Sequence, residues 1–468
     1  MSFFSKSILR SGLVLLLCLT LSGCLGSKRA YQRPELEMSG SWMEEGLSDK
    51  SLAGRWWEDF KDPVLNRLVE EALEKNIDLA ASGLLVMQAR IKADLAGGDR
   101  LPTVKAGGGT EISRDFSTDS SSEKHDFSVS GSVSYEVDLW GRLSSLHEAA
   151  RWEAMATEED RASTAIALVA TTINLYWEIA WLNQRIETEE ASIAHAKKTL
   201  ELVKVQKDAG TVTSLELLEA ERNLANQESG LFTLVQQRVE KRNALSILFG
   251  GPPKTLEFEE PQRLSLAHLP EVAAGLPAEL LSRRPDLKSA EARLRGTLAS
   301  GNATRASYYP SFTLSGTLGS SSDSLSDVLK NPIGSLAANI LLPFVQWREM
   351  HRNIRLSEVE YDHAVLTFRQ TLYNALADVE NSLSARTQYR LQEEKLIKNL
   401  DAAKKSEALY ALRYEAGAIP IINWLDAQEN RRQAEISLAE NRLNQLQNQV
   451  TLYKALGGDM DFDVSNPE

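Results

Sequence analysis

The sequence is poor in cysteine: only Cys18 and Cys24 occur among 468 residues. Cys18 falls inside a leader in which Lys6 and Arg10 precede a nearly apolar run over residues 11–21. A charged segment followed by a short apolar segment is typical of a secretory signal peptide. Since no cysteine follows position 24, a disulfide, a thiolate metal site and a cysteine nucleophile are excluded from the rest of the chain.

The leader ends in Leu21-Ser22-Gly23-Cys24, which resembles a bacterial lipobox. The resemblance implies that Cys24 receives a diacylglyceryl thioether, becomes the new N-terminus and is acylated on its amine. The alternative is an ordinary signal peptide followed by an incidental cysteine. Leu25 follows the motif instead of aspartate, so retention at the inner membrane is not indicated.

The sequence also has no excess of positive charge and no catalytic constellation. The formal net charge of −13 and the pI near 5.2 argue against a nucleic-acid partner, which needs clustered lysine and arginine. Gly107-Gly108-Gly109 does not open a helix with a following Lys-Ser, so it is not a phosphate loop. The seven methionines are unclustered, and the six histidines show no metal-ligand spacing: His125, His147, His195, His268, His351 and His363. We therefore expect no enzyme activity, no cofactor and no metal site.

Proline is absent from Ser144 to Asp208, where alanine, leucine and glutamate dominate. A continuous helix there would be on the order of 100 Å long at about 1.5 Å per residue. Gly210 ends this run and Gly417 ends a similar one, and a second helical pattern follows each glycine. Each half of the chain is thus predicted to contain a long helical hairpin. After the leader we expect no transmembrane helix, so a membrane crossing would need strands in a closed barrel.

The two halves of the chain repeat each other. Asp78-Leu79 and Pro102 recur as Asp286-Leu287 and Pro310, and residues 196–251 match residues 403–458 without a gap. The offset is 208 in the first comparison and 207 in the second. The chain is predicted to begin with a signal peptide (1–23) and a lipid-anchored segment (24–62). A first repeat (63–260) follows, with a strand pair about 104–139 and a hairpin tip near 210. The second repeat (261–458) has a strand pair about 311–343 and a hairpin tip near 417, and a tail (459–468) ends the chain.

Each repeat contains one pair of amphipathic strands. From Phe127 to Leu139 apolar or small residues alternate with serine and carboxylate, and the alternation recurs from Phe312 to Leu318. Serine-rich loops are predicted at residues 117–122 and 320–324. Lipid outside and water inside a barrel require this pattern, although a sheet packed on the helices of a soluble protein is the alternative. Four strands are too few to close a barrel, so closure requires several copies of the chain.

The chain resembles the outer-membrane efflux protein family, the TolC-like outer-membrane factors, in the lipoprotein branch that serves RND-type tripartite systems. The motifs that carry the resemblance span nearly the whole mature chain: Tyr31-Gln32-Arg33-Pro34, Trp56-Trp57, Phe60, Asp62-Pro63, Leu65, Asn76-Ile77-Asp78-Leu79, Tyr135-Glu136-Val137-Asp138-Leu139-Trp140-Gly141-Arg142, Arg283-Arg284-Pro285-Asp286-Leu287 and Leu425-Asp426-Ala427-Gln428. One departure is Pro343-Phe344-Val345-Gln346-Trp347-Arg348, which lacks the glycine usual after this strand.

The resemblance implies a mostly α-helical fold with a transmembrane β-barrel. In that family three protomers contribute four strands each to a shared twelve-stranded barrel, and their helices form a periplasmic tunnel. The homotrimer docks onto a periplasmic adaptor protein and an inner-membrane pump.

The resemblance also implies candidate site residues at the hairpin tips. Acidic rings at the periplasmic gate would correspond to Glu216 and Glu219 in the first hairpin and to Asn423 and Asp426 in the second, with Tyr414 as a gate tyrosine. Residues three apart share a helix face, so each pair points one way. The alternative is that these are solvated residues near helix starts, where acids favour the dipole.

The adaptor-docking tips would be two three-residue turns, for which a plain helix stop is the alternative: Gly210-Thr211-Val212 and Gly417-Ala418-Ile419. Ile419 stands where the best-known relative has an arginine that ties the gate shut, and Asn423 replaces an acid, so this gate is expected to be latched differently. Trp140 and Tyr135 fit a membrane-interface girdle or a core position equally well.

These observations predict a passive outer-membrane export channel for small molecules, anchored by lipid and driven by partners elsewhere. Export of metal ions or type I secretion of proteins are alternatives within the same class. A lipid-anchored helical scaffold and a lipoprotein hydrolase are the alternatives from other classes. The scaffold would not need the alternating strands, and the hydrolase would need a nucleophile and a base that the sequence does not offer.

Overall fold

The computed structural model describes residues 28–35, 41–43, 54–114, 123–253, 258–264, 269–270 and 277–458. The predicted signal peptide, Cys24, the loop of residues 117–122 and the tail of residues 459–468 lie outside them. The elements are η1 (Trp56–Phe60), α2 (Pro63–Lys75), α3 (Ile77–Gly98), β1 (Thr103–Arg114), β2 (Glu123–Val137), α4 (Arg142–Asp208), α5 (Ser214–Leu248), η2 (Pro277–Glu279), α6 (Leu280–Arg283), α7 (Pro285–Ala306), β3 (Ser311–Ser322), η3 (Leu325–Asp327), β4 (Ile333–Leu341), η4 (Pro343–Val345), α8 (Trp347–Glu415) and α9 (Ile421–Ala455).

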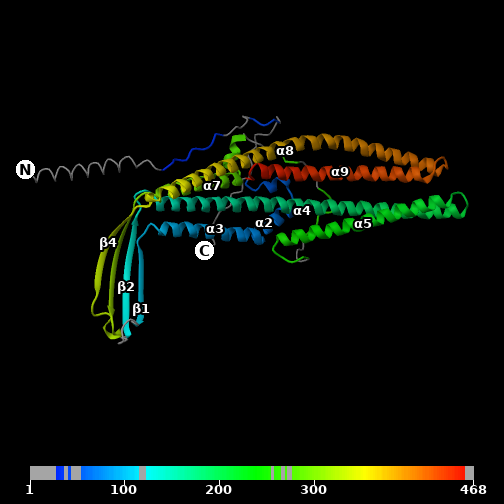
Figure 1. Ribbon diagram of the computed structural model, residues 1–468. Coiled ribbons are helices and arrows are strands. Elements are labelled where there is room, and N and C mark those ends of the chain that lie inside the picture. The colour runs from blue at the N-terminus through cyan, green and yellow to red at the C-terminus, as the bar shows by residue number, and fades with distance from the viewer. Residues whose placement is uncertain are drawn as a thin grey trace, which may run out of the picture. The chain divides into compact units, whose positions relative to one another are not determined.

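The described elements occur twice along the chain, as the sequence repeat predicts (Figure 1). Helices α3 and α7 have 22 residues each, and α7 begins 208 positions after α3. Helices α5 and α9 have 35 residues each, and α9 begins 207 positions after α5. The long helices α4 and α8 have 67 and 69 residues, in agreement with the expected hairpins. The bounds of the two repeats, residues 63–260 and 261–458, stay a prediction.

The chain divides into two compact units, and each takes segments from both halves. The first, here called the sheet unit, consists of Met1–Leu36, Leu85–Glu158 and Ser289–Gln370. The second, the hairpin unit, consists of Glu37–Leu84, Glu159–Lys288 and Thr371–Glu468. The units therefore do not coincide with the repeats. Helices α3, α4, α7 and α8 each begin in one unit and end in the other.

One antiparallel sheet in the order β1-β2-β3-β4 forms the strand part of the sheet unit (Figure 1). Its register aligns apolar and small residues in rows across all four strands. Val133 of β2 pairs with Val104 of β1 and with Gly316 of β3, and Gly316 pairs with Leu336 of β4. Side chains alternate between faces along a strand, so these rows make one face of the sheet apolar.

The opposite face of the sheet is polar. Ser132 of β2 pairs with Lys105 of β1 and with Thr317 of β3, and Thr317 pairs with Ser335 of β4. The loop predicted at residues 320–324 is wrong in part, because residues 320–322 extend β3 and pair with β2. The 15 residues of β2 offer these serines backbone partners, and this pairing outweighs their preference for turns.

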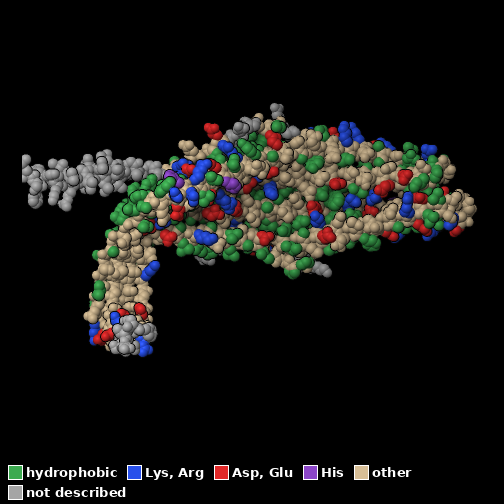
Figure 2. Space-filling model, in the orientation of Figure 1, with side chains coloured by type: hydrophobic (Ala, Val, Ile, Leu, Met, Phe, Trp, Pro, Cys, Tyr) green, Lys and Arg blue, Asp and Glu red, His purple; other side chains and the backbone are tan. Residues whose placement is uncertain are grey.

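Most charged residues of the sheet lie at one end. Figure 2 shows charged side chains along the helices and at the end of the sheet beside the residues in grey, whereas most of the strand surface in view lacks them. The residues where β1 stops and β2 begins account for this: Glu111, Arg114, Glu123, Lys124 and Asp126. The apolar band of the sheet is thus bounded by charge at the loop end.

The motif from Glu136 to Arg142 forms the turn from β2 into α4. Arg142 donates two hydrogen bonds to Glu136, of 3.0 and 2.7 Å. Asp138 accepts from the backbone nitrogens of Leu143 and Ser144 at 3.0 and 2.8 Å, which satisfies donors that a helix N-terminus leaves free. The motif therefore fixes how the helix leaves the sheet.

Trp140 in the same turn packs inside the sheet unit. Its indole Nε1 donates to the carbonyl oxygen of Pro310 at 2.7 Å, and its ring stacks on Tyr309 with centroids 5.1 Å apart. This contact joins the turn between β2 and α4 to the residues that follow α7. Of the two roles left open for Trp140, packing is the one with a partner in the structure.

The apolar part of α4 bears on the expectation that no transmembrane helix follows the leader. By length and composition, α4 contains a segment apolar enough to cross a membrane. Most of that segment is buried among other parts of the same chain, as in the core helix of a soluble protein. Packing, rather than lipid, accounts for its apolar character.

Candidate functional site

Both hairpin tips end their first helix in the same way. Gly210 and Gly417 adopt φ values of +71° and +69°, the left-handed region that favours glycine. The next residue donates back across the turn, Thr211 to the carbonyl of Gln206 and Ala418 to that of Arg413, each at 2.9 Å. These are Schellman motifs, which close a helix and reverse the chain. The predicted tip residues thus lie in the two turns, and their docking role stays a prediction.

The first tip carries a capping box. The Glu216 carboxylate accepts from the backbone nitrogen of Thr213 at 3.0 Å and also contacts the Thr213 hydroxyl, while that hydroxyl accepts from the nitrogen of Leu215 at 3.2 Å. The hydrogen bond with the Thr213 side chain is the main reason why the pKa of Glu216 is lowered. Glu216 is therefore held at the start of α5. The second tip has Pro420 at the corresponding position, without a side-chain cap.

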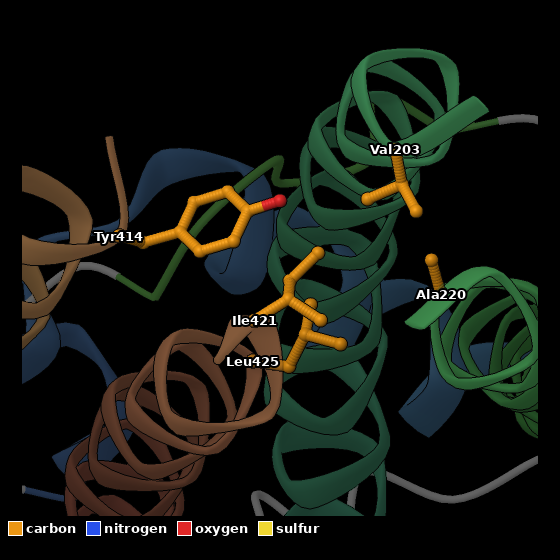
Figure 3. Packing of buried hydrophobic residues seen from close by; sticks show 5 residues of the cluster. All are labelled: Val203, Ala220, Tyr414, Ile421 and Leu425. Atoms are coloured by element: carbon orange, nitrogen blue, oxygen red, sulfur yellow. The ribbon is translucent and has the colours of Figure 1, made fainter. Parts of the chain in front are cut away.

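A buried cluster joins the two hairpins just behind the tips (Figure 3). It consists of Val203 on α4, Ala220 on α5, Tyr414 on α8, and Ile421 and Leu425 on α9. The tip residues Val212 and Ile419 pack against it. All four long helices thus contribute to one core at the end of the hairpin unit, and we call it the tip cluster.

Tyr414 is the only polar member of the tip cluster. Figure 3 shows its hydroxyl pointing towards α4, where it donates to Oε1 of Gln206 at 2.6 Å. Its ring stacks on Trp424, with centroids 5.4 Å apart. Burial is the main cause of its raised pKa; the Gln206 contact opposes the rise and the charge of Glu216 adds to it. Tyr414 stays neutral at physiological pH, so this link between the hairpins carries no charge.

The structure brings two of the four acidic-ring candidates together. Glu219 and Asp426 both line a cavity of about 690 Å³ between α4, α5 and α9. Glu219 forms an ion pair with Arg222 at 2.5 Å, whereas Asp426 and Asn423 are exposed. Glu216 is occupied in the capping box instead. Glu219 and Asp426 thus contribute to the charge of this cavity beside the tip cluster, together with the other charged residues that line it: Arg185, Glu189, Arg222, Glu429 and Arg432.

An ion-pair network in the wall of the same cavity was not found from the sequence. Arg432 on α9 contacts Glu189 on α4 at 3.1 Å and Glu429 at 2.7 Å. The Glu189 side chain is only 4% exposed. The Glu429 hydrogen bond is the leading cause of the raised pKa of Arg432. Only the Glu429–Arg432 spacing was visible in the sequence, because Glu189 lies 243 positions away.

The N-terminal segment Lys28–Glu35, which follows the predicted lipid anchor, lies along α7 in the sheet unit. Asn302 exchanges two hydrogen bonds with the backbone of Arg29, at 3.0 and 3.1 Å. Further along, Glu291 accepts from the Tyr31 hydroxyl at 3.0 Å and from Arg33 at 2.6 Å. We call this segment the strap.

Glu291 is the central partner of the strap. Its side chain is 9% exposed and contacts Arg33 and Arg295, at 2.6 and 2.8 Å. Burial acts to raise the pKa of Glu291, but the hydrogen bonds from Arg33, Arg295 and Tyr31 outweigh it and the pKa is lowered. Burial and the Glu291 charge together raise the pKa of Tyr31 to about 12. One ionised carboxylate thus holds two segments that are far apart in the sequence.

The lowered pKa of Glu291 predicts a pH dependence. Its ionised form contributes stability above the ordinary glutamate pKa, and this contribution is lost as the pH falls through the lowered folded value. Glu291→Gln should cost about 2 kcal/mol at neutral pH, since charged hydrogen bonds contribute roughly 1.5–3 kcal/mol. Thermal melts of both proteins should converge in acid. Glu153→Gln is the control: Glu153 is an exposed residue of α4 that pairs with Arg293 of α7, so its loss should change little. A pH-independent difference for Glu291→Gln would contradict the assignment.

Within the described ranges, no group of three or more histidine, cysteine or acidic side chains is arranged to hold a metal ion. The chemistry available at the tips is therefore that of a charged cavity and an uncharged contact between hairpins.

The chain was compared with known proteins. Residues 68–251 and 276–458 match the model of the family described as outer membrane efflux protein. The chain is 33% identical over 457 residues to the pyoverdine export outer membrane protein OpmQ of Pseudomonas aeruginosa, covering 95% of this chain and 96% of that one. It is 32% identical to the toluene efflux pump outer membrane protein TtgI of Pseudomonas putida, covering 92% and 94% of the two chains.

The fold is also similar to solved structures. The CmeC outer membrane channel of Campylobacter jejuni superposes with a TM-score of 0.85, covering 93% of this chain and 96% of that one, at 23% identity. At that identity the likeness shows the fold, which is that of the TolC-like channels. The predicted fold class is confirmed.

Proposed function

The chain belongs to the outer membrane efflux protein family, and we propose on this premise that it forms a passive homotrimeric channel for small organic molecules. The protein is placed in the outer membrane, with its helices in the periplasm, as are its relatives. Pyoverdine and toluene are the cargo named for two relatives, and their chemistry favours small organic substrates. The proposal includes no catalytic step in this chain. The energy for export is proposed to come from a pump in the inner membrane.

The single observation that carries the proposal is the sheet. Four described strands have one apolar and one polar face, and the outer edges of β1 and β4 lack a partner strand. Lipid tolerates neither free edges nor an open sheet. Three copies close the sheet into a barrel of twelve strands, with the serine and threonine rows lining a water-filled lumen.

The hairpin tips are the proposed meeting point with the periplasmic adaptor protein. The turns expose Gly210 and Thr211 at one tip and Gly417 and Ala418 at the other, which leaves small side chains and backbone open to a partner. Val212 and Ile419 instead face the tip cluster and support the turns. An adaptor and an inner-membrane pump are the partners that this arrangement needs.

Lipidation at Cys24 fits the position of the strap. Three residues separate Cys24 from Lys28, and four steps of extended chain span at most about 14 Å. The strap would therefore hold the acyl chains close to the end of α7 that leads into the sheet. The mass of the mature N-terminal peptide tests this, since an unmodified Cys24 would contradict it.

Asp426 is proposed to set the charge of the periplasmic constriction. Rings of exposed carboxylates attract cations and repel anions, so Asp426→Ala should reduce cation preference and alter single-channel conductance in a planar bilayer. Asp401→Ala, on an exposed acid of α8 that pairs with Lys405, is the matched control and should leave both unchanged. A verified trimer that conducts identically with and without Asp426 would contradict the gate assignment, and a monomer that never inserts would contradict the channel.

Tyr414 is proposed to hold the gate closed through an uncharged contact. Tyr414→Phe keeps the stacking on Trp424 but removes the hydrogen bond to Gln206, a loss of about 1 kcal/mol, or roughly a fivefold shift towards the open state. Single-channel recordings should show a higher open probability. Gln206→Leu should give the same result, and the double variant should add little, because both changes remove one contact. Additive effects, or an equal change in Tyr410→Phe, would argue against this latch.

A further inference from the structure

One lysine lies among the serine and threonine rows on the polar face of the sheet. Lys105 of β1 pairs with Ser132 of β2, and the row continues through Thr317 to Ser335. The hydroxyl oxygens of Thr317 and Ser335 lie 2.6 Å apart, so the side chains of this row point to the same side. Lys105 is exposed and forms no ion pair with any residue that the structure describes. Its positive charge is therefore available to a ligand.

The other charges of the polar face lie towards its two ends. Alternation along β1 and β2 places four more charged residues on this face: Glu111, Lys124, Asp126 and Glu136. Glu136 is already bound by Arg142, with hydrogen bonds of 3.0 and 2.7 Å. Glu111 and Asp126 lie opposite each other near the loop end, and Glu111 is roughly 20 Å from Lys105 along β1. Lys105 is thus the only charge on the described rows between the two ends.

The rows on the loop side of Lys105 carry small side chains. Gly107 and Gly109 of β1 pair with Ser130 and Ser128 of β2. A Cβ added at Gly109 would lie 3.5 Å from Oγ of Ser128, which places both residues on the same face. The polar face between Lys105 and the loop end therefore leaves room for a solute.

A closed barrel of three copies brings three of these lysines to one level. Twelve strands about 4.8 Å apart and tilted by roughly 40° enclose a radius of about 12 Å. The Debye length at physiological salt is about 8 Å, and each ammonium reaches inward from the wall on a four-carbon stem. The fields of the three lysines therefore overlap across the lumen.

We propose that Lys105 of the three protomers forms a basic ring inside the barrel, which binds the carboxylate groups of anionic cargo during export. Each ammonium offers such a group up to three hydrogen-bond donors together with its charge. The acids at the loop end, Glu111 and Asp126, lie more than a Debye length away and do not cancel the ring. This inference rests on the proposed channel and adds the charge of its cargo.

Cysteine reporters measure the local charge of the barrel, because the only cysteines of the chain are Cys18 and Cys24. Ser132→Cys places a thiol opposite Lys105, with the two Cβ atoms about 5 Å apart. Native trimers are treated with a negatively and a positively charged thiosulfonate reagent. Adding Lys105→Gln should lower the ratio of the anionic to the cationic rate constant roughly fourfold, the effect of one unit charge at that distance in salt solution.

Two matched variants control this measurement. Lys330→Gln removes the same charge from the loop between β3 and β4, where Lys330 pairs with Asp327 at 2.6 Å, and should leave the ratio at Ser132→Cys unchanged. Val133→Cys lies on the apolar face and should react with neither reagent. Equal ratios with and without Lys105 would overturn the basic ring and leave the channel intact. Reaction at Val133→Cys in place of Ser132→Cys would overturn the water-filled lumen, and with it the channel.

Citrate, a polycarboxylate, tests the class of cargo. At constant ionic strength it should slow the reaction of the anionic reagent with Ser132→Cys, because both compete for the ring. This protection should disappear when Lys105→Gln is added. Protection that is absent with Lys105 in place, or equal in the two proteins, would overturn carboxylate binding.

Discussion

Replacing Gly457 with alanine is expected to destabilise the protein by about 3 kcal/mol or more, whereas Gly417→Ala should cost only about 1 kcal/mol. Both residues adopt positive φ, +98° and +69°. A Cβ at Gly417 would meet open space, but at Gly457 it would lie 2.9 Å from the carbonyl carbon and oxygen of Arg283. Backbone cannot yield as a flexible side chain does, so the second substitution adds overpacking to conformational strain.

Gly250 provides an internal replicate of this prediction. It is the counterpart of Gly457 in the first half, and its added Cβ would lie 2.7 Å from the carbonyl oxygen of Lys75. Thermal unfolding followed by far-UV circular dichroism, with the three alanine variants side by side, measures the difference. Equal losses at Gly417 and Gly457 would show that φ alone, and not the close approach of the backbone, governs the cost.

Replacing Arg284 with methionine is the second change with a large expected effect, a loss of about 3 kcal/mol. The Arg284 side chain is 11% exposed and forms a two-pronged pair with Asp286, at 3.0 and 2.7 Å. It also donates to Asp378 at 3.3 Å and to the carbonyl oxygen of Ala455 at 3.1 Å. Methionine fills the space but removes the donor to Asp378 and to the carbonyl oxygen of Ala455, while Asp286 keeps the hydrogen bond from the backbone nitrogen of Leu287.

The charge of Arg284 is secure in the native protein. Burial acts to lower its pKa, but the contacts with Asp286 and Asp378 raise it on balance. Arg283→Met is the matched control: Arg283 pairs with Glu279 one helical turn away, and its loss should change stability by about 0.5 kcal/mol or less. Denaturant unfolding of the two variants tests the contrast. If Arg284→Met unfolds at the same denaturant midpoint as Arg283→Met, the contacts of Arg284 contribute no net free energy of unfolding.

Both predictions concern the end of each hairpin opposite the tip. Arg284 binds the last carbonyl of α9, and Asn76 binds that of Leu248 in α5 at 2.9 Å, so each half fastens its returning helix with a buried polar side chain. At the tips the corresponding polar link is the single hydrogen bond from Tyr414 to Gln206, and the turn glycines face open space. Rearrangement of the hairpins is therefore expected to be easiest at the tips, where the gate is proposed.

The site was predictable from the sequence only where its contacts are local. The Thr213–Glu216 capping box follows from residue spacing, yet Glu216 was assigned to a charged ring, because the same spacing also puts it on a face with Glu219. The cavity shared by Glu219 and Asp426, and the bond between Tyr414 and Gln206, were out of reach. They depend on how the helices of the two hairpins are oriented relative to one another, and local sequence patterns do not specify this orientation.

The sequence by itself determined the type, length and order of the elements. Helix and strand periodicities, turn glycines and the 207-residue offset are short-range or repeating signals, and the helices of 35 residues in both halves agree with them. Only the tertiary structure decided that Ser320 belongs to β3, that the apolar stretch of α4 is buried in the core, and that Arg284 holds the end of α9. The physical reason is that pairing and burial are set by partners far along the chain, whereas each residue's own preferences act only on its neighbours.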